Sequence, residues 1–268
     1  MKLFFSEFRA NYEKYYFPYQ VWLLKEESDE VEKILDKGFL PIRNLPDVYY
    51  LSRSTRADLG KFELSSENKR ILKKTSGIES DLISLSDFNY TAQVQKFCKD
   101  YSDNKLGKGL FSTETIKGIF NNGIFNHVFV FKDILSQKEI GYAVCFISLN
   151  FLHYAYAFYD LAYLKQNLGA RMMLEAVSWA KKSHKNYAYL GTCYERGSLY
   201  KTEFKGIEFF TGFRWSENKD ELKQLITFGE NQSEESETYL LRNIEYLESF
   251  YQGDLNSILN NFGSQVNF

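Results

Sequence analysis

Groups that could take part in acyl transfer follow an aromatic run near the middle of the chain. Tyr159 and Asp160 end a predicted strand, and Gln166-Asn167-Leu168-Gly169 follows at the expected start of a helix. Ligands usually bind where strands end in layered α/β folds, and the free N–H groups and dipole of a helix N-terminus attract phosphate. The pattern indicates a site for a phosphate-bearing donor. A half-buried tyrosine, a turn-capping aspartate and an ordinary helix start would explain the same residues.

A second polar segment could begin a helix that faces phosphate. Ser65 is a favourable N-cap residue, and the turn after it is polar and basic, with Lys69 and Arg70. A solvated helix face that carries lysines would produce the same pattern.

Other residue types that carry enzyme chemistry do not form recognisable groups. The cysteines Cys98, Cys145 and Cys193 lie far apart and never form a Cys-x-x-Cys pair. The sequence also contains no P-loop, Ser-His-Asp or metalloprotease motif. We therefore expect no metal site. The histidines are scattered as well and are expected to be surface or strand residues: His127, His153 and His184.

Periodic patterns predict the framework that would position these groups. Strands are predicted over 127–132, 140–147 and 153–159, as in a β-meander. An amphipathic helix over 170–182 and a strand over 187–191 come next. This is the order expected of a GNAT-type acyltransferase core. The predicted fold class is therefore α/β or α+β, with a mixed sheet flanked by helices.

Composition is that of an ordinary folded protein. The 268 residues are 44% hydrophobic, 25% charged and 18% aromatic, with a net charge of −2. Disorder, collagen and coiled coils are excluded. Charges follow the first five residues too closely for a secretory signal, so we expect a cytoplasmic protein with no membrane span. We expect three parts: a smaller N-terminal region over 1–80, a GNAT-like catalytic domain over 81–230 and an acidic helical tail over 231–268.

Ordered blocks of the chain resemble the aminoacyl-tRNA–protein transferase family. In that family a Phe-Tyr-Asp strand precedes a Ser-Leu-Gly helix start, and a Tyr-Leu-Gly strand precedes a Tyr-Lys-x-x-Phe segment. The matching blocks here are Phe158-Tyr159-Asp160, Asn167-Leu168-Gly169, Tyr189-Leu190-Gly191 and Leu199-Tyr200-Lys201-Thr202-Glu203-Phe204. An upstream segment is similar to the family's Arg…Phe-x-x-Ser-x-x-Gln-Arg-Arg block through Arg56, Phe62, Ser65, Lys69 and Arg70.

The resemblance implies transfer of leucine or arginine from a charged tRNA to the N-terminal Asp or Glu of a target protein, which marks the target for degradation. Leucine is preferred because the length resembles the shorter bacterial members. The implied partners are aminoacyl-tRNA and proteins with acidic N-termini, with no DNA and no membrane. No cofactor is expected beyond the aminoacyl-tRNA co-substrate.

The chain departs from the family pattern at several positions. Members typically carry an N-terminal cysteine cluster, whereas residues 15–52 contain no Cys, and Asn167 replaces the serine of Ser-Leu-Gly. Two alternatives therefore stay open. One is an acyl-CoA-dependent GNAT N-acyltransferase, which Gln166-x-x-Gly169 favours and the bulky Arg171 disfavours. The other is a catalytically inactive relative that binds N-terminal peptides or tRNA.

Aminoacyl transfer is the attack of an amine on an activated ester. The pKa of an α-amine is about 7.7–8, so positioning and oxyanion stabilisation should matter more than a strong base. We expect backbone N–H groups at a splayed strand end and a hydroxyl of Tyr159 or Tyr200 to stabilise the oxyanion. Asp160 would place the amine, and Lys201 would bind tRNA phosphate or the acidic acceptor side chain.

Cationic side chains are expected to hold the two anionic partners. Arg and Lys suit both tRNA phosphates and carboxylates. Because the net charge is near zero, tRNA affinity should be weak and salt-sensitive. The predicted substrate-binding residues are Arg56, Ser65, Lys69, Arg70, Asn167, Leu168 and Gly169.

Overall fold

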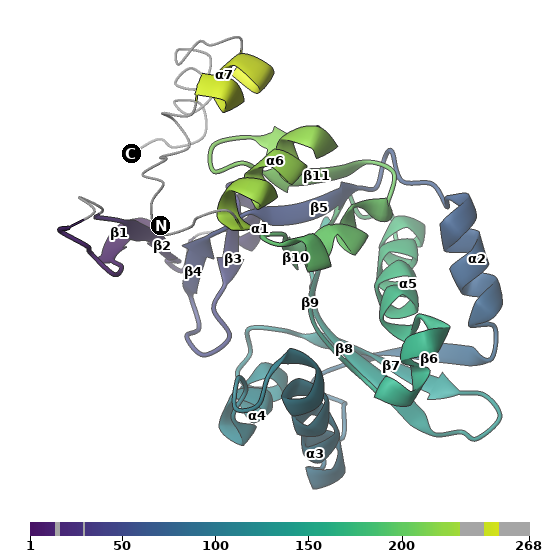
Figure 1. The fold of residues 1–268 in the computed structure, drawn as a ribbon. Coiled ribbons are helices and arrows are strands. Elements are labelled where there is room, and N and C mark those ends of the chain that lie inside the picture. Colours follow the sequence, from purple (N-terminus) through teal and green to yellow (C-terminus); the bar gives the residue numbers. More distant parts are fainter. Residues whose placement is uncertain (14–16, 29, 231–243, 252–268) are drawn as a thin grey trace.

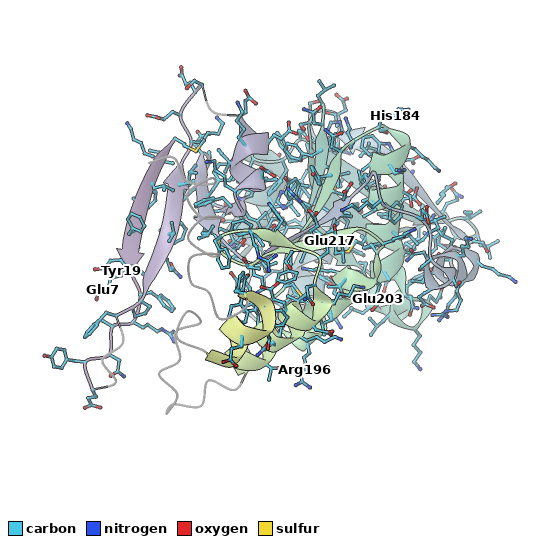
Figure 2. The ribbon with its side chains drawn as sticks, turned by 90° about the horizontal axis from the view of Figure 1, so that it is seen from above. Glu7, Tyr19, His184, Arg196, Glu203 and Glu217 are labelled. Atoms are coloured by element: carbon cyan, nitrogen blue, oxygen red, sulfur yellow. The ribbon has the colours of Figure 1, made fainter. Side chains whose placement is uncertain are left out.

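A computed structural model describes residues 1–13, 17–28, 30–230 and 244–251, and it contains two β-sheets (Figure 1). The smaller sheet has the order β1-β2-β4-β3 with antiparallel pairs. Its β1–β2 hairpin extends away from the rest of the chain, with Glu7 and Tyr19 together at one end (Figure 2). The elements of this part are β1 (Lys2–Glu7), β2 (Tyr19–Leu24), α1 (Val31–Asp36), β3 (Phe39–Pro41) and β4 (Val48–Leu51).

The larger sheet has eight strands in the order β12-β11-β5-β10-β9-β8-β7-β6. Strands β9 and β10 are parallel, and the other neighbours are antiparallel. The predicted mixed sheet is therefore confirmed. The strands are β5 (Ser54–Asp58), β6 (Ile78–Ser84), β7 (His127–Asp133), β8 (Glu139–Ile147), β9 (Phe151–Tyr159), β10 (Tyr187–Thr192), β11 (Ile207–Phe210) and β12 (Trp215–Ser216).

Helices cover both faces of the large sheet (Figure 1). Helices α2 (Ser66–Lys74) and α5 (Leu168–Lys182) lie on one face, and α3 (Ala92–Tyr101) and α4 (Thr113–Asn121) lie on the other. Seven apolar residues of α5 are buried because its amphipathic stripe packs on the sheet. Shorter turns connect these layers: η1 (Ser102–Leu106), η2 (Leu161–Gln166) and η3 (Arg196–Glu203).

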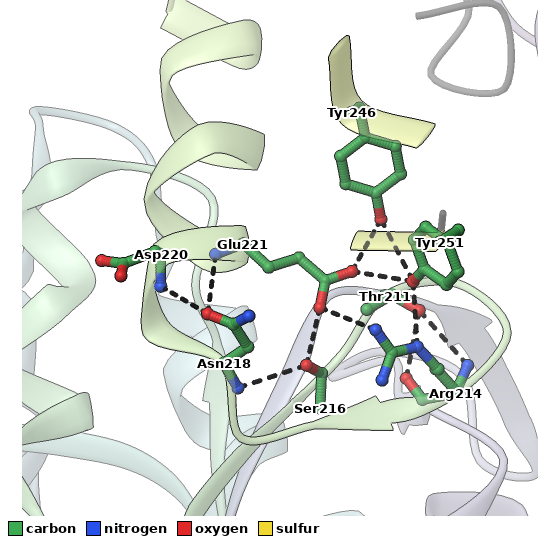
Figure 3. A network of polar contacts seen from close by, with 8 residues as sticks. All are labelled: Thr211, Arg214, Ser216, Asn218, Asp220, Glu221, Tyr246 and Tyr251. Atoms are coloured by element: carbon green, nitrogen blue, oxygen red, sulfur yellow. Dashed lines mark hydrogen bonds and ion pairs between the residues drawn. The ribbon is translucent and has the colours of Figure 1, made fainter. Parts of the chain in front are cut away.

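A buried carboxylate attaches the C-terminal helix α7 (Ile244–Tyr251) to α6 (Lys219–Glu230) (Figure 3). Glu221 has no exposed surface and accepts hydrogen bonds from the hydroxyls of Tyr246 at 2.8 Å and Tyr251 at 2.7 Å. Arg214 and Ser216 bond its other oxygen. A charged group can be buried when it is paired and hydrogen-bonded in this way. The remaining residues of the predicted acidic tail, 231–243 and 252–268, lie outside the described residues.

The central strands and helices match the predictions, with differences at three places. The helix does not follow its strand directly: the Asp160 side chain accepts a hydrogen bond from the Ala162 N–H at 3.0 Å and begins η2, and Asn167 then takes a left-handed conformation (φ 64°) before α5. Strand β5 was not predicted, yet it lies between β10 and β11. The predicted domain boundary after residue 80 falls inside β6, so segments assigned to the N-terminal region belong to the central sheet.

Candidate active site

The parallel strands β9 and β10 pair only at their beginnings and then separate. Their paired residues are Tyr187 with Phe151, Ala188 with Leu152 and Tyr189 with His153. Beyond this point the register of β9 against β8 shifts by one residue, so Ala155 is not paired with any residue of β8. The register of β10 against β5 also shifts, near Gly191. A bulge bends and twists its strand. The two strand ends therefore diverge and leave a gap in the middle of the sheet.

A cavity of about 880 Å³ opens at this gap. Residues 153–159 of β9 form one wall, and the first turn of α5, the η1 segment, η3 and the edge of the small sheet form the others. Its volume lies within the range of sites that enclose drug-sized ligands. The cavity can therefore enclose a small molecule of that size.

Unpaired backbone donors point into this cavity from β9. The N–H of Asp160 donates to Ile140 O on β8 at 2.9 Å. Because N–H groups alternate along a strand, those of Ala157 and Tyr159 point the other way, toward the side from which β10 has diverged. These two residues line the cavity. Their N–H groups can therefore donate hydrogen bonds to an oxygen atom of a ligand bound in the gap.

Tyr159 and Gly169 come together on one wall. A Cβ atom at Gly169 would lie 3.0 Å from the Tyr159 ring and 3.2 Å from its hydroxyl, so only glycine leaves room for this ring. The ring also packs on Tyr101, with centroids 4.8 Å apart. Burial, together with a hydrogen bond to Tyr159, raises the pKa of the Tyr101 hydroxyl. Tyr159 is thus fixed between α3 and α5.

Lys201 and Tyr200 reach the cavity from η3, and Asn167 lies at its edge before α5. The Lys201 ammonium donates a hydrogen bond to Thr192 O at 2.7 Å, which leaves further protons for a ligand. Burial lowers the pKa of Lys201. Five of the predicted site residues therefore share one cavity: Tyr159, Tyr200, Lys201, Asn167 and Gly169.

Asp160 and Leu168 do not line this cavity. The Asp160 carboxylate forms an ion pair with Lys138 at 2.7 Å and caps η2, so it faces away from the gap. Leu168 is the first residue of α5, and its side chain is completely buried in the core. The structure thus does not support the predicted placement of the amine by Asp160 or of a ligand by the Leu168 side chain.

The cations predicted from the upstream block also lie elsewhere. The Arg56 guanidinium is buried between Asp36 at 2.6 Å and Glu208 at 2.7 Å, so the chain itself satisfies it. Ser65 forms a capping box at the start of α2, as its sequence position predicted. Arg70 is paired with Glu67 of the same helix, and Lys69 is exposed there.

Sequence reasoning missed several cavity residues. His153 is only 5% exposed, and burial lowers its pKa to about 4, so the imidazole is neutral at physiological pH. A lone histidine in an aromatic strand gives no signal of this position. The guanidinium carbon of Arg43 lies 4.4 Å from the centroid of the Phe111 ring, and Arg43 also lines the cavity. Glu195 lines the cavity as well. Both come from connecting segments that no pattern linked to the strands.

The described residues contain neither a metal-binding cluster nor a membrane-spanning helix. No cluster of three or more His, Cys, Asp or Glu side chains suited to a metal ion occurs within residues 1–13, 17–28, 30–230 and 244–251. In the same described ranges, no helix combines the length and apolar character required to span a membrane.

The sequence is similar to one family model and to curated proteins. Residues 86–211 match the model described as arginine-tRNA-protein transferase, C terminus. This stretch supplies every wall of the cavity except the part from the small sheet and Arg43.

Three relatives are named aspartate/glutamate leucyltransferase. The protein from Ruegeria pomeroyi is 25% identical over 174 residues, which cover 62% of this chain and 62% of the relative. The protein from Pseudoalteromonas atlantica is 26% identical over 57% of this chain and 64% of the relative. The protein from Stenotrophomonas maltophilia is 30% identical over 32% of this chain and 35% of the relative. The chain thus matches less than two thirds of the length of each relative.

Proposed function

We propose that the chain is a member of the aminoacyl-tRNA–protein transferase family and that it transfers an amino acid from aminoacyl-tRNA to the N-terminal Asp or Glu of a target protein. The observation that carries the proposal is the cavity between β9 and β10, because the family-matched stretch builds most of its walls. Leucine is the proposed amino acid, since the similar curated proteins are named leucyltransferases. The modified target would be marked for degradation, and the reaction would take place in the cytoplasm, where charged tRNA occurs.

The cavity offers separate groups for the donor and the acceptor. The N–H groups of Ala157 and Tyr159 face the gap and would receive the carbonyl oxygen of the aminoacyl ester. Arg43 and Lys201 lie at the cavity and would hold the carboxylate of the acceptor residue, since charge-assisted hydrogen bonds to carboxylates are strong. An acceptor with a neutral side chain would leave these cations without a partner, which gives a physical reason for selecting Asp or Glu.

The proposed step uses positioning and charge stabilisation. The neutral α-amine attacks the ester carbonyl carbon, a C–N bond forms, and the carbonyl oxygen becomes an oxyanion that the β9 N–H groups and the Tyr159 hydroxyl stabilise. The tetrahedral intermediate then collapses and breaks the C–O bond to the ribose. The proton lost by the amine is taken up by the departing ribose oxygen. Two groups at the cavity could relay this proton, the neutral His153 and the Tyr200 hydroxyl.

Mass spectrometry tests this function. A peptide that begins with Asp or Glu is incubated with the protein and total aminoacylated tRNA, and a parallel reaction contains acetyl-CoA instead. The proposal predicts a gain of one leucine residue that RNase treatment abolishes, and no gain on a matched peptide that begins with Asn or Gln. An acetyl gain would instead place the protein among CoA-dependent acyltransferases, and binding of the peptide without any gain would indicate an inactive relative.

A further inference from the structure

Helices α2 and α5 carry an excess of positive charge that the proposed reaction does not use. Residues 61–74 and 165–185 together contain ten Lys or Arg and three Glu, whereas the whole chain has a net charge of −2. Seven of these cations lie on α2, on α5 or directly beside them, and six of the seven are exposed; together we call them the α2–α5 basic face. Its members are Lys69, Lys73, Lys74, Lys165, Lys181, Lys182 and Lys185.

The lysines of this face are not neutralised by carboxylates. None of them forms an ion pair with any residue that the structure describes, unlike Arg70 beside Glu67 or Arg56 beside Glu208. Backbone carbonyls hold three of them in place: Lys74 donates to Lys165 O at 2.6 Å, Lys181 donates to Leu59 O and Lys185 donates to Ser148 O at 2.6 Å. A carbonyl fixes an ammonium without cancelling its charge.

The basic face is continuous with the cavity. The Lys74–Lys165 contact joins the end of α2 to the segment before α5, and the neighbouring Leu164 and Asn167 line the cavity. Lys181 bonds Leu59 at the other end of α5, where Figure 2 shows His184. Helix α5 has 15 residues, so the face extends roughly 22 Å away from the cavity edge. Figure 1 shows the shorter α2 beside α5.

We propose that the α2–α5 basic face binds the sugar–phosphate backbone of the tRNA acceptor arm, so that the 3′ end enters the cavity at the Lys165 edge. This inference rests on the proposed function, which brings an RNA 3′ end into the cavity. Isolated lysines suit the role because phosphate contacts orient a nucleic acid without reading its sequence. The docking site therefore differs from the predicted Arg56 and Arg70, whose charges are already paired.

Binding of deacylated tRNA tests the surface directly. The triple variant Lys69→Glu, Lys73→Glu and Lys182→Glu reverses three exposed charges on the face. Its matched control reverses three exposed lysines elsewhere and so changes the net charge equally: Lys33→Glu, Lys117→Glu and Lys223→Glu. Affinity is measured by fluorescence anisotropy over a salt series, and circular dichroism checks that both variants are folded.

The proposal predicts that the face variant loses at least tenfold in tRNA affinity at low salt. The slope of log affinity against log salt should also fall by about two to three, since each lost phosphate contact removes somewhat less than one unit. The control should bind like the wild type. Equal affinities of the two triple variants would overturn the proposal. Loss of binding to anionic vesicles with unchanged tRNA binding would overturn it as well and assign the face to a membrane surface.

A second donor separates this inference from the proposed function. An aminoacylated trinucleotide that ends in CCA fills the cavity but is too short to reach the far end of α5. The face variant should lose transfer from intact aminoacyl-tRNA at subsaturating donor while it keeps the wild-type rate from the trinucleotide. Equal losses with both donors would overturn the docking proposal. If the wild type transfers from neither donor, the proposed function fails, and the RNA-binding comparison still decides the role of the face.

Discussion

Gly169→Ala would displace Tyr159 within the cavity while leaving the fold in place. The new methyl carbon would lie 3.0 Å from one ring carbon of Tyr159, 3.1 Å from another and 3.2 Å from the hydroxyl oxygen. Carbon atoms prefer separations of about 3.5–4.0 Å, so the ring must withdraw by about half an ångström. It cannot do so freely because Tyr101 packs on it at a centroid distance of 4.8 Å.

The effect on stability should be small, and the effect on transfer should be large. Overpacking costs about 1–3 kcal/mol, and replacing Gly by Ala in a helix returns up to about 1 kcal/mol. The free energy of unfolding should therefore fall by about 0–3 kcal/mol, which leaves the protein folded. A misplacement of about 1 Å can cost on the order of a hundredfold in rate, so half of that predicts on the order of a tenfold loss in kcat/KM.

Gly118→Ala is the matched control for this variant. Gly118 also lies within a helix, α4, but the atom nearest to its added methyl carbon would be the Asn122 side-chain nitrogen at 3.8 Å, so the substitution fits without a shift. Steady-state transfer to an acidic peptide is measured for both variants, with thermal denaturation in parallel. A Gly169→Ala protein that transfers at the wild-type rate would refute the argument that the position of Tyr159 sets the rate.

Three further predictions concern buried charges. Because burial lowers the pKa of Lys201, transfer should decline as pH rises through this lowered pKa, and Lys201→Arg should move the decline to higher pH in a pH–rate profile. Glu221→Gln should lower the free energy of unfolding by about 3 kcal/mol and Tyr246→Phe by about 1–3 kcal/mol in chemical denaturation; wild-type stability in both would exclude the network that attaches α7. Arg56→Met should cost about 3–5 kcal/mol because Glu208 loses its partner, whereas a selective loss of tRNA affinity would return Arg56 to the binding site.

The parts of the fold that could be predicted from the sequence have local patterns. Strands β7, β8 and β9 are nearly continuous apolar runs of strand length, and helix α5 repeats apolar residues with the helical period, so a short window is sufficient. Strand β5 was missed because its sequence Ser-Thr-Arg-Ala-Asp is polar, and its strand partners β10 and β11 come more than a hundred residues later. Arg56 is buried there only because Asp36, Glu208 and aromatic rings surround it.

The site was predictable to the extent that its residues follow strand ends. Tyr159 and Lys201 line the same cavity because β9 and β10 are neighbours in the sheet. The sequence offered turn capping as one explanation of Asp160, and the structure confirms it, but the ion pair with Lys138 was not predictable because it forms between separate strands. His153 was missed because its burial beside the gap depends on where the pairing of β9 with β10 ends.

The most direct measurement of the central claim is a crystal structure with a non-hydrolysable amide analogue of 3′-leucyl-adenosine. We predict that the analogue occupies the gap between β9 and β10, with its carbonyl oxygen within hydrogen-bonding distance of the Ala157 or Tyr159 N–H and its adenosine toward Lys165. An analogue bound outside this gap, or bound inside with its carbonyl directed away from β9, would contradict it.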